Sequence, residues 1–154
     1  LTLCIAQSLL RNGDLRFREL IRTVAGLASP TGHWPEAIHP LTGGGCMGDG
    51  QHGWAAAEWV MMLHNSFVRE EGDHLIIGSG IWPEWLADSA DIRFGPILTP
   101  LGMIRLRLES SADQALLNLS IPHPDRSRTL VANIPGFAPV TIDNPGEPIR
   151  LTPA

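Results

Sequence analysis

The chain has 154 residues, of which 44% are hydrophobic and 18% are charged, and its formal net charge is −5 at pH 7. These values are typical of a folded globular protein and exclude a disordered chain. Lysines and arginines form no cluster, and no apolar run approaches the roughly 20 residues of a membrane-spanning helix. We therefore expect neither nucleic acid nor a membrane as a partner.

The first 72 residues carry three helical patterns. An apolar segment over residues 1–10 is followed by Gly13, which suits a helix end, and by Asp14, which suits the N-cap of a second helix. In that helix the apolar residues recur at helical spacing: Phe17, Leu20, Ile21, Val24 and Leu27. A third helix is predicted from about residue 51 to 70, and its apolar residues lie nearly all round, so we expect it to be buried on most sides.

Residues 73–154 change from helical spacing to alternation of apolar and polar residues. Strands are predicted near residues 74–78, 103–109, 117–121, 130–134, 140–142 and 149–151, and a single helical turn at 82–86. Short strands at this spacing are typical of an antiparallel β-sandwich. The predicted fold class is α+β, with an α-helical segment at 1–72 and a small antiparallel β-domain at 73–154.

The predicted helices need more apolar partners than one small β-domain supplies. Either further helices belong to the protein or copies of the chain cover one another, so a homo-oligomer through exposed apolar helices remains open. The chain starts at Leu1 in the middle of a hydrophobic pattern, and we expect it to be part of a longer protein. The only cysteines are Cys4 and Cys46, which favours free thiols in a reducing compartment such as the cytoplasm.

A segment rich in glycine and proline, residues 32–54, separates the second and third helices. It holds three histidines, two tryptophans and two carboxylates within 23 residues. Sugar sites combine such groups, because tryptophan faces stack on pyranose rings while carboxylates and histidines bind hydroxyl groups. The plainer interpretation is a loop whose aromatic and histidine side chains pack against the protein.

Other chemistries fit this segment less well. Its ligand-type side chains match no helical zinc motif and include no C-x-x-C pair, so neither a metal nor a cofactor is predicted. These side chains are His33, Glu36, His39, Cys46, Asp49 and His52. The glycines at 43–45 lack the Gly-Lys-Ser/Thr that follows in a phosphate loop, and Cys46 lacks the signature of a nucleophile.

Two runs of the segment resemble the late part of (α/α)6-barrel glycoside hydrolases, the six-hairpin superfamily of glucosidases and debranching-type enzymes. The runs are WPEAIHPLTG at 34–43 and GWAAAEW at 53–59. In that pattern an aromatic residue precedes a glutamate, Pro-x-Thr-Gly and a glycine-rich turn follow, and Trp-(Ser/Ala)-Ala comes next. The resemblance implies that Glu36 is the general base of an inverting hydrolysis, and that a small β-domain follows the end of the barrel.

Four further residues complete the predicted carbohydrate site. Trp34 is a stacking candidate, and Asp49, His39 and His52 are candidates for binding sugar hydroxyls. Each has a structural alternative: Trp34 could pack in the core, Asp49 could cap the third helix, and the histidines could bind backbone carbonyls. Glu36 could instead tie down the loop through backbone amides.

Three residues of the third helix are assigned structural roles. Glu58 is expected to be a partnered carboxylate, and Trp54 and Trp59 are expected to belong to the core. The chain has about three helices where a full barrel has twelve, and no residue matches the general acid of the family. We therefore expect a C-terminal portion that is inactive alone. The alternative is a non-catalytic carbohydrate-binding or oligomerisation module.

Overall fold

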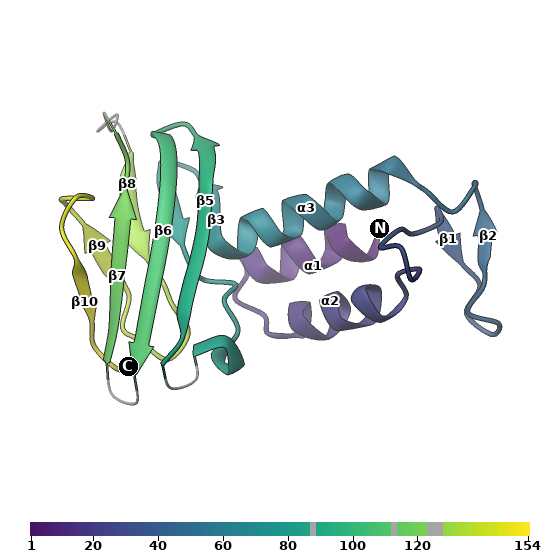
Figure 1. Cartoon of the computed structure of the whole chain (residues 1–154), viewed down its shortest axis with the longest axis horizontal. Coiled ribbons are helices and arrows are strands. Elements are labelled where there is room, and N and C mark those ends of the chain that lie inside the picture. Colours follow the sequence, from purple (N-terminus) through teal and green to yellow (C-terminus); the bar gives the residue numbers. More distant parts are fainter. Residues whose placement is uncertain (87–88, 112–113, 123–127) are drawn as a thin grey trace. The chain divides into compact units, whose positions relative to one another are not determined.

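The computed structural model describes residues 1–86, 89–111, 114–122 and 128–154. The chain contains helices and sheets and divides into two compact units, residues 1–65 and 66–154, so the α+β class is confirmed (Figure 1). Within the described ranges, no helix has the length and hydropathy needed to cross a membrane. The two units are described separately below.

The first unit is built on three helices. They are α1 (Thr2–Arg11), α2 (Arg16–Gly26) and α3 (Gly53–Phe67), whose last two residues belong to the second unit. Apolar side chains of α1 and α2 form the centre of this unit, among them Leu3, Ala6, Leu10, Phe17 and Ile21. The predicted amphipathic second helix is confirmed, with Phe17 and Ile21 as its buried residues.

The turn between α1 and α2 follows from Gly13 and Asp14. Gly13 has a φ of +69°, and the amides of Gly13 and Asp14 donate to the carbonyls of Leu10 and Leu9, which is a Schellman ending of α1. The Asp14 carboxylate accepts hydrogen bonds from the backbone amide of Arg16, at 3.0 Å, and from its guanidinium. Asp14 therefore satisfies a free amide at the start of α2, as predicted, although the residue directly before the helix is Leu15.

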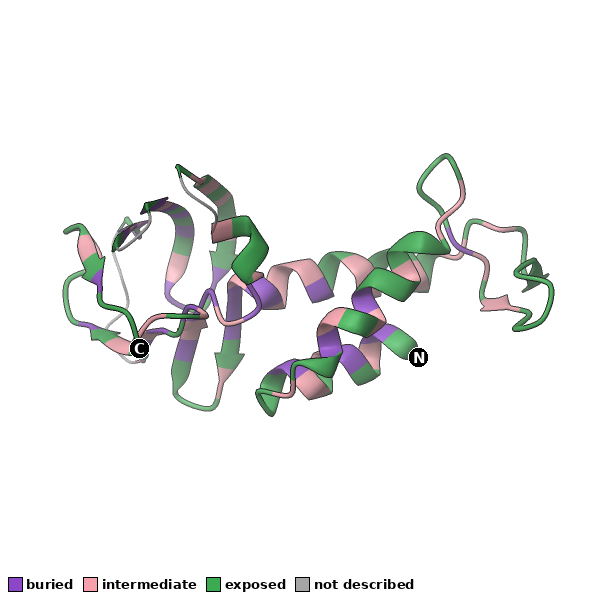
Figure 2. Ribbon diagram, turned by 90° about the horizontal axis from the view of Figure 1, so that it is seen from below, coloured by how far each residue is buried: buried purple, intermediate pink, exposed green. Residues whose placement is uncertain are grey.

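The prediction that the third helix is buried on most sides is wrong. Met62 is fully buried, but Trp54, Val60 and Met61 are 69%, 64% and 51% exposed. The helix also ends at Phe67, before the predicted residue 70, because Val68 starts a strand that pairs with Ile77. An apolar helix in this chain thus lacks cover along much of its length (Figure 2).

The loop between α2 and α3 contains a small hairpin. Strands β1 (Ala37–Ile38) and β2 (Gly45–Met47) pair antiparallel, with Ala37 opposite Met47 and Ile38 opposite Gly45. The backbone of Gly45 passes so close to Pro35 that an added Cβ would lie 3.0 Å from two of its ring carbons. Any larger residue at position 45 would therefore force Pro35 to shift by a few tenths of an ångström.

The second unit contains two four-stranded sheets. The first has the order β10-β7-β6-β5 and the second β3-β4-β8-β9. The strands of the first sheet are β5 (Asp91–Thr99), β6 (Gly102–Ser111), β7 (Gln114–Ser120) and β10 (Ile149–Leu151). Those of the second are β3 (Val68–Glu71), β4 (His74–Ile77), β8 (Thr129–Ala132) and β9 (Val140–Ile142).

Side chains of both sheets form one hydrophobic core. Ile104, Leu106 and Leu108 of β6 are buried and alternate with exposed or half-buried residues, as predicted. Leu75 and Ile77 contribute to the same core from β4. The helical turn η1 (Pro83–Leu86) also lies where it was predicted.

The β-unit departs from the prediction in three places. Strands β4 and β8 pair parallel, so the unit is not purely antiparallel. Strand β3 was missed, because its pairing with β4 depends on the two-residue turn at 72–73, where Gly72 has a φ of +56°. Strand β5 was missed because Gly95 and Pro96 interrupt its alternation, and proline inside a run argues against a strand.

We expect opposite effects from two glycine substitutions in the helical hairpin. Gly13→Ala should lower the free energy of unfolding by roughly 1–2 kcal/mol, because an L-residue is strained at a positive φ although no atom lies within 4 Å. Gly26→Ala, the matched control, has the same free space without positive φ and should be neutral or stabilising by about 0.5–1 kcal/mol. Urea unfolding followed by helical circular dichroism measures both, and equal effects would contradict this explanation of the turn.

A second prediction concerns the pH dependence of the same turn. Hydrogen bonds from the side chain and then the backbone amide of Arg16 lower the pKa of Asp14 from 3.8 to about 2. Since the folded chain favours the ionised form, this stabilisation is complete above about pH 4 and is lost as the pH falls through about 2. Carboxyl carbon shifts measured against pH should show the low midpoint, and Arg16→Gln should raise it toward 3.8. A midpoint near 3.8 in the unsubstituted chain would disprove the interaction.

Candidate functional site

A hollow of about 720 Å³ opens in the first unit, bordered by the start of α1, the end of α2, strand β1 and the first turns of α3. Its lining includes six side chains capable of binding or chemistry: Trp34, Glu36, His39, His52, Trp54 and Glu58. Four of the five predicted site residues therefore border one hollow. The fifth, Asp49, borders an adjoining hollow of about 480 Å³.

Glu36 lies at the rim of the larger hollow, directly before β1. Its backbone amide donates to the carbonyl of Met47 at 3.2 Å, which fixes its place in the small hairpin. The side chain is exposed, and among the described residues none donates a hydrogen bond to its carboxylate. The described residues therefore give no support to the alternative role for Glu36, that of tying down backbone amides.

His39 is held by the turn that it begins. Its Nδ1 accepts hydrogen bonds from the backbone amides of Leu41 and Thr42, both at 3.3 Å. An accepting Nδ1 places the proton of the neutral ring on Nε2. The Nε2–H group has no partner in the described part of the chain, so it remains available as a donor to a ligand.

Trp34 anchors the loop to two helices. Its indole Nε1–H donates to the Val24 carbonyl of α2 at 2.7 Å, and its ring lies against Trp59 of α3 with 5.2 Å between centroids. Only 8% of its surface is exposed. The packing role therefore leaves little of the ring for stacking on a sugar, although Trp34 borders the hollow.

Asp49 and His52 both precede α3, which begins at Gly53. The His52 amide donates to the Trp34 carbonyl at 2.8 Å, and its own carbonyl accepts from the Ala56 amide at 3.2 Å, so His52 directly precedes the helix and accepts its first backbone hydrogen bond. Its imidazole has no partner within the described ranges. The Asp49 carboxylate accepts from the Gln51 amide at 2.9 Å, which closes a loop turn and does not cap α3.

Two residues that were assigned structural roles also border the hollow. Glu58 is partnered as expected: its carboxylate accepts from Gln7 of α1 at 2.6 Å and from the Trp54 indole at 3.2 Å. Gln7 in turn accepts from Asn65 at 2.7 Å, so this network joins α1 to α3. The assignment of Trp54 to the core is wrong, because its side chain is 69% exposed. The sequence signal was the i, i+4 spacing of Trp54 and Glu58, which places both on one helix face.

The hollow combines kinds of side chain that are able to bind a polyhydroxylated ligand. It offers one unpartnered carboxylate at Glu36, one exposed indole at Trp54, and imidazole groups at His39 and His52. In the described ranges, no three histidine, cysteine or acidic side chains are grouped to hold a metal ion. Cys4 borders the hollow and Cys46 is exposed, and neither forms a disulfide.

Neither family models, nor curated proteins, nor solved structures match this chain.

Proposed function

We propose that the chain is the C-terminal portion of an inverting glycoside hydrolase, in which Glu36 is the general base. The observation that supports this most is the unpartnered carboxylate of Glu36 at the rim of a hollow that also exposes the Trp54 indole. In this proposal the three helices are the end of an (α/α)6 barrel, and the two sheets are the β-sandwich that follows it.

The proposed chemistry requires Glu36 to hold a water molecule. As the water attacks the anomeric carbon, its proton passes to the Glu36 carboxylate, and a general acid protonates the leaving oxygen on the opposite face of the sugar. The acid should lie about 6.5–9.5 Å from the base to leave room for the water. Both oxygens of Glu58 already accept hydrogen bonds within the unit, so we assign the acid to a residue outside this chain.

The remaining side chains of the hollow would hold the sugar. The exposed ring of Trp54 offers a stacking face, and the Nε2–H of His39 and the imidazole of His52 offer hydrogen bonds to hydroxyl groups. Trp34 would act mainly by fixing the loop. Asp49 borders the adjoining hollow, where it would contact a neighbouring sugar unit.

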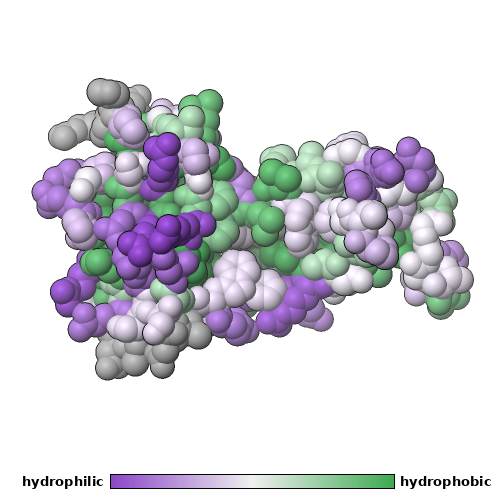
Figure 3. All heavy atoms as spheres, in the orientation of Figure 1, coloured by the Kyte–Doolittle hydropathy of each residue, from purple (hydrophilic) through white to green (hydrophobic). Residues whose placement is uncertain are grey.

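An assembly role is the second candidate, and the exposed apolar residues of the first unit favour it. Ile5, Val60 and Met61 are 46%, 64% and 51% exposed, and hydrophobic residues are visible on the surface of the helices (Figure 3). Further helices of a barrel or a second copy of the chain would cover this surface. A mass that rises with protein concentration would support self-association.

Saccharide binding by the chain provides the first test. We expect mono- or disaccharides from a panel of neutral sugars to shift the indole resonance of Trp54, and Trp54→Ala to weaken the binding about threefold to tenfold. Met61→Ala is the matched control, because Met61 is also exposed on α3 but does not border the hollow. If no sugar shifts any resonance of the hollow, the proposed substrate class is wrong.

Hydrolysis provides the second test. The 154-residue chain should not turn over aryl glycosides, because it lacks the acid. In a longer protein that contains this chain, Glu36→Gln should lower kcat by about 10²–10⁴-fold with little change in KM. Glu19→Gln, at an exposed position of α2, is the control and should have no effect.

Two outcomes of the hydrolysis test would contradict parts of the proposal. Turnover by the 154-residue chain that Glu36→Gln abolishes would show that the acid lies within the chain. Saccharide binding without turnover in the longer protein would favour a carbohydrate-binding module over an enzyme.

A further inference from the structure

A third hollow, of about 460 Å³, lies on the outer face of the sheet β10-β7-β6-β5. All of its lining residues belong to the second unit, so it is separate from the hollow around Glu36. The polar side chains in its lining are Arg93, Arg105, Arg107, Asn118, Ser120 and Glu147. Three guanidinium groups on one small surface are unusual in a chain with a net charge of −5.

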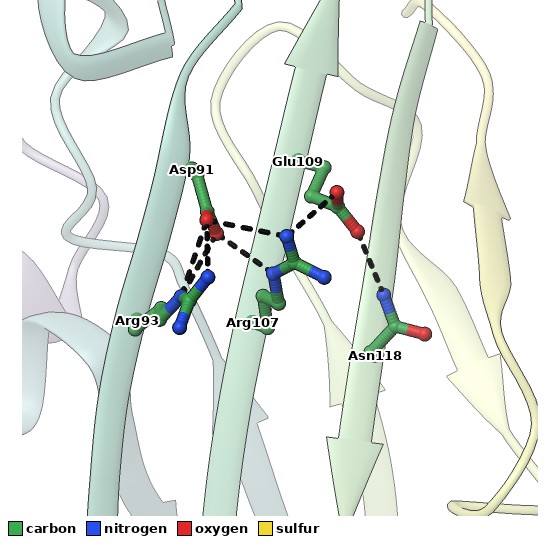
Figure 4. A network of polar contacts seen from close by, with 5 residues as sticks. All are labelled: Asp91, Arg93, Arg107, Glu109 and Asn118. Carbon is green, nitrogen blue, oxygen red and sulfur yellow. Dashed lines mark hydrogen bonds and ion pairs between the residues drawn. The ribbon is translucent and has the colours of Figure 1, made fainter.

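Two of the three arginines are neutralised by acidic neighbours (Figure 4). The Asp91 carboxylate accepts hydrogen bonds from the guanidinium groups of both arginines. The shortest bond from Arg107 is 2.8 Å long, and the shortest from Arg93 is 2.7 Å long. These bonds, first from Arg107 and then from Arg93, hold the pKa of Asp91 well below its usual range. Arg107 also contacts Glu109 at 3.0 Å, and Glu109 accepts from the Asn118 amide at 3.4 Å.

Arg105 has no such partner. It is exposed, and no side chain or backbone group in the described residues forms a hydrogen bond or ion pair with it. Its position in the sheet explains this, because the pairing of β5 with β6 shifts between Phe94 and Ile97. Gly95 and Pro96 therefore lie opposite Arg105 as a bulge, and neither supplies a polar side chain.

Gly95 of this bulge borders the hollow without a side chain, and the close approach of the β6 backbone requires glycine there. Gly95 has a φ of +103°, and an added Cβ would lie 2.5 Å from the Ile104 carbonyl oxygen. On the other side of Arg105, the register partner is Ser120 of β7. Arg105 thus borders the hollow together with Ser120 and Asn118. The amide nitrogen of Asn118 donates to Glu109, and its amide oxygen can still accept a hydrogen bond.

We propose that this hollow binds a small hydroxylated monocarboxylate, such as a sugar acid, with the carboxylate on Arg105 and the hydroxyls on Asn118 and Ser120. A guanidinium matches a carboxylate in a two-bond, planar arrangement. Asp91 and Glu109 pair with Arg93 and Arg107, which leaves Arg105 as the guanidinium of the hollow without a carboxylate partner among the described residues. A dianion such as phosphate would lack a second free guanidinium, and the carboxylate of Glu147 would repel its two charges more strongly than the single charge of a monocarboxylate.

The proposal does not rest on glycoside hydrolysis, because none of these residues belongs to the first unit. It is tested with the complete 154-residue chain, by following amide resonances during titration with sodium glucuronate, sodium acetate, glucose and sodium phosphate at constant ionic strength. We expect saturable shifts around Arg105, Asn118 and Ser120 with glucuronate. Acetate should bind at the same place more weakly, and glucose should not bind there.

Two variants sharpen the test. Arg105→Gln removes a side chain on which no described contact depends, and it should weaken glucuronate binding about tenfold or more. Arg150→Gln is the matched control, because it removes the same charge from an exposed strand residue of this sheet that does not border the hollow. Its affinity for glucuronate should equal that of the unsubstituted chain.

Four results would overturn the proposal. They are the absence of saturable shifts with glucuronate, equal binding of glucose and glucuronate at the hollow, tighter binding of phosphate than of glucuronate, and undiminished glucuronate binding by Arg105→Gln. Equal binding of acetate and glucuronate would support the contact between the carboxylate and Arg105. It would contradict the proposed hydrogen bonds of the hydroxyl groups to Asn118 and Ser120.

Discussion

The candidate site of the first unit depends on one buried tryptophan. Trp34 donates its indole hydrogen to the Val24 carbonyl, packs its ring against Trp59, and accepts the His52 amide on its own carbonyl. These three contacts hold a glycine-rich loop between two helices, where conformational entropy would otherwise oppose a fixed structure. Glu36 follows two residues later, so the position of its carboxylate is set by the anchoring of Trp34.

The two units differ in how far the polar side chains around their hollows are paired with one another. In the first unit, a carboxylate, an indole and two imidazoles border a hollow, and the side chains of Glu36 and His52 have no partner among the described residues. In the second, the described residues pair Arg93 and Arg107 with Asp91 and Glu109 on the sheet face and leave Arg105 without a partner. Unpaired groups at the edge of a concave surface are suited to a ligand, whereas paired groups fix the surface that surrounds it.

Elements with strong periodicity could be predicted from the sequence, and elements that depend on distant partners could not. Ile104, Leu106 and Leu108 alternate because one face of β6 is buried, and that pattern is visible in the residues themselves. The network around Glu58 needs Gln7, which is 51 residues away, and no local pattern shows such a pair. The exposure of Trp54 was missed for a related reason: an apolar residue on an apolar helix indicates burial, while its actual cover depends on what packs against the helix.

The double pairing of Asp91 also limits how strongly the outer face of the sheet would attract anions. One carboxylate occupies two guanidinium groups, and a second, Glu109, adds a further contact to one of them. Loss of the Asp91 charge, as in an asparagine substitution, would leave Arg93 without this partner beside Arg105, while Arg107 would keep its contact with Glu109, so the strip of arginines would become more cationic. Such strips attract sulfated glycans and nucleic acids without regard to their sequence. The Asp91 carboxylate thus lowers the affinity of this surface for polyanions.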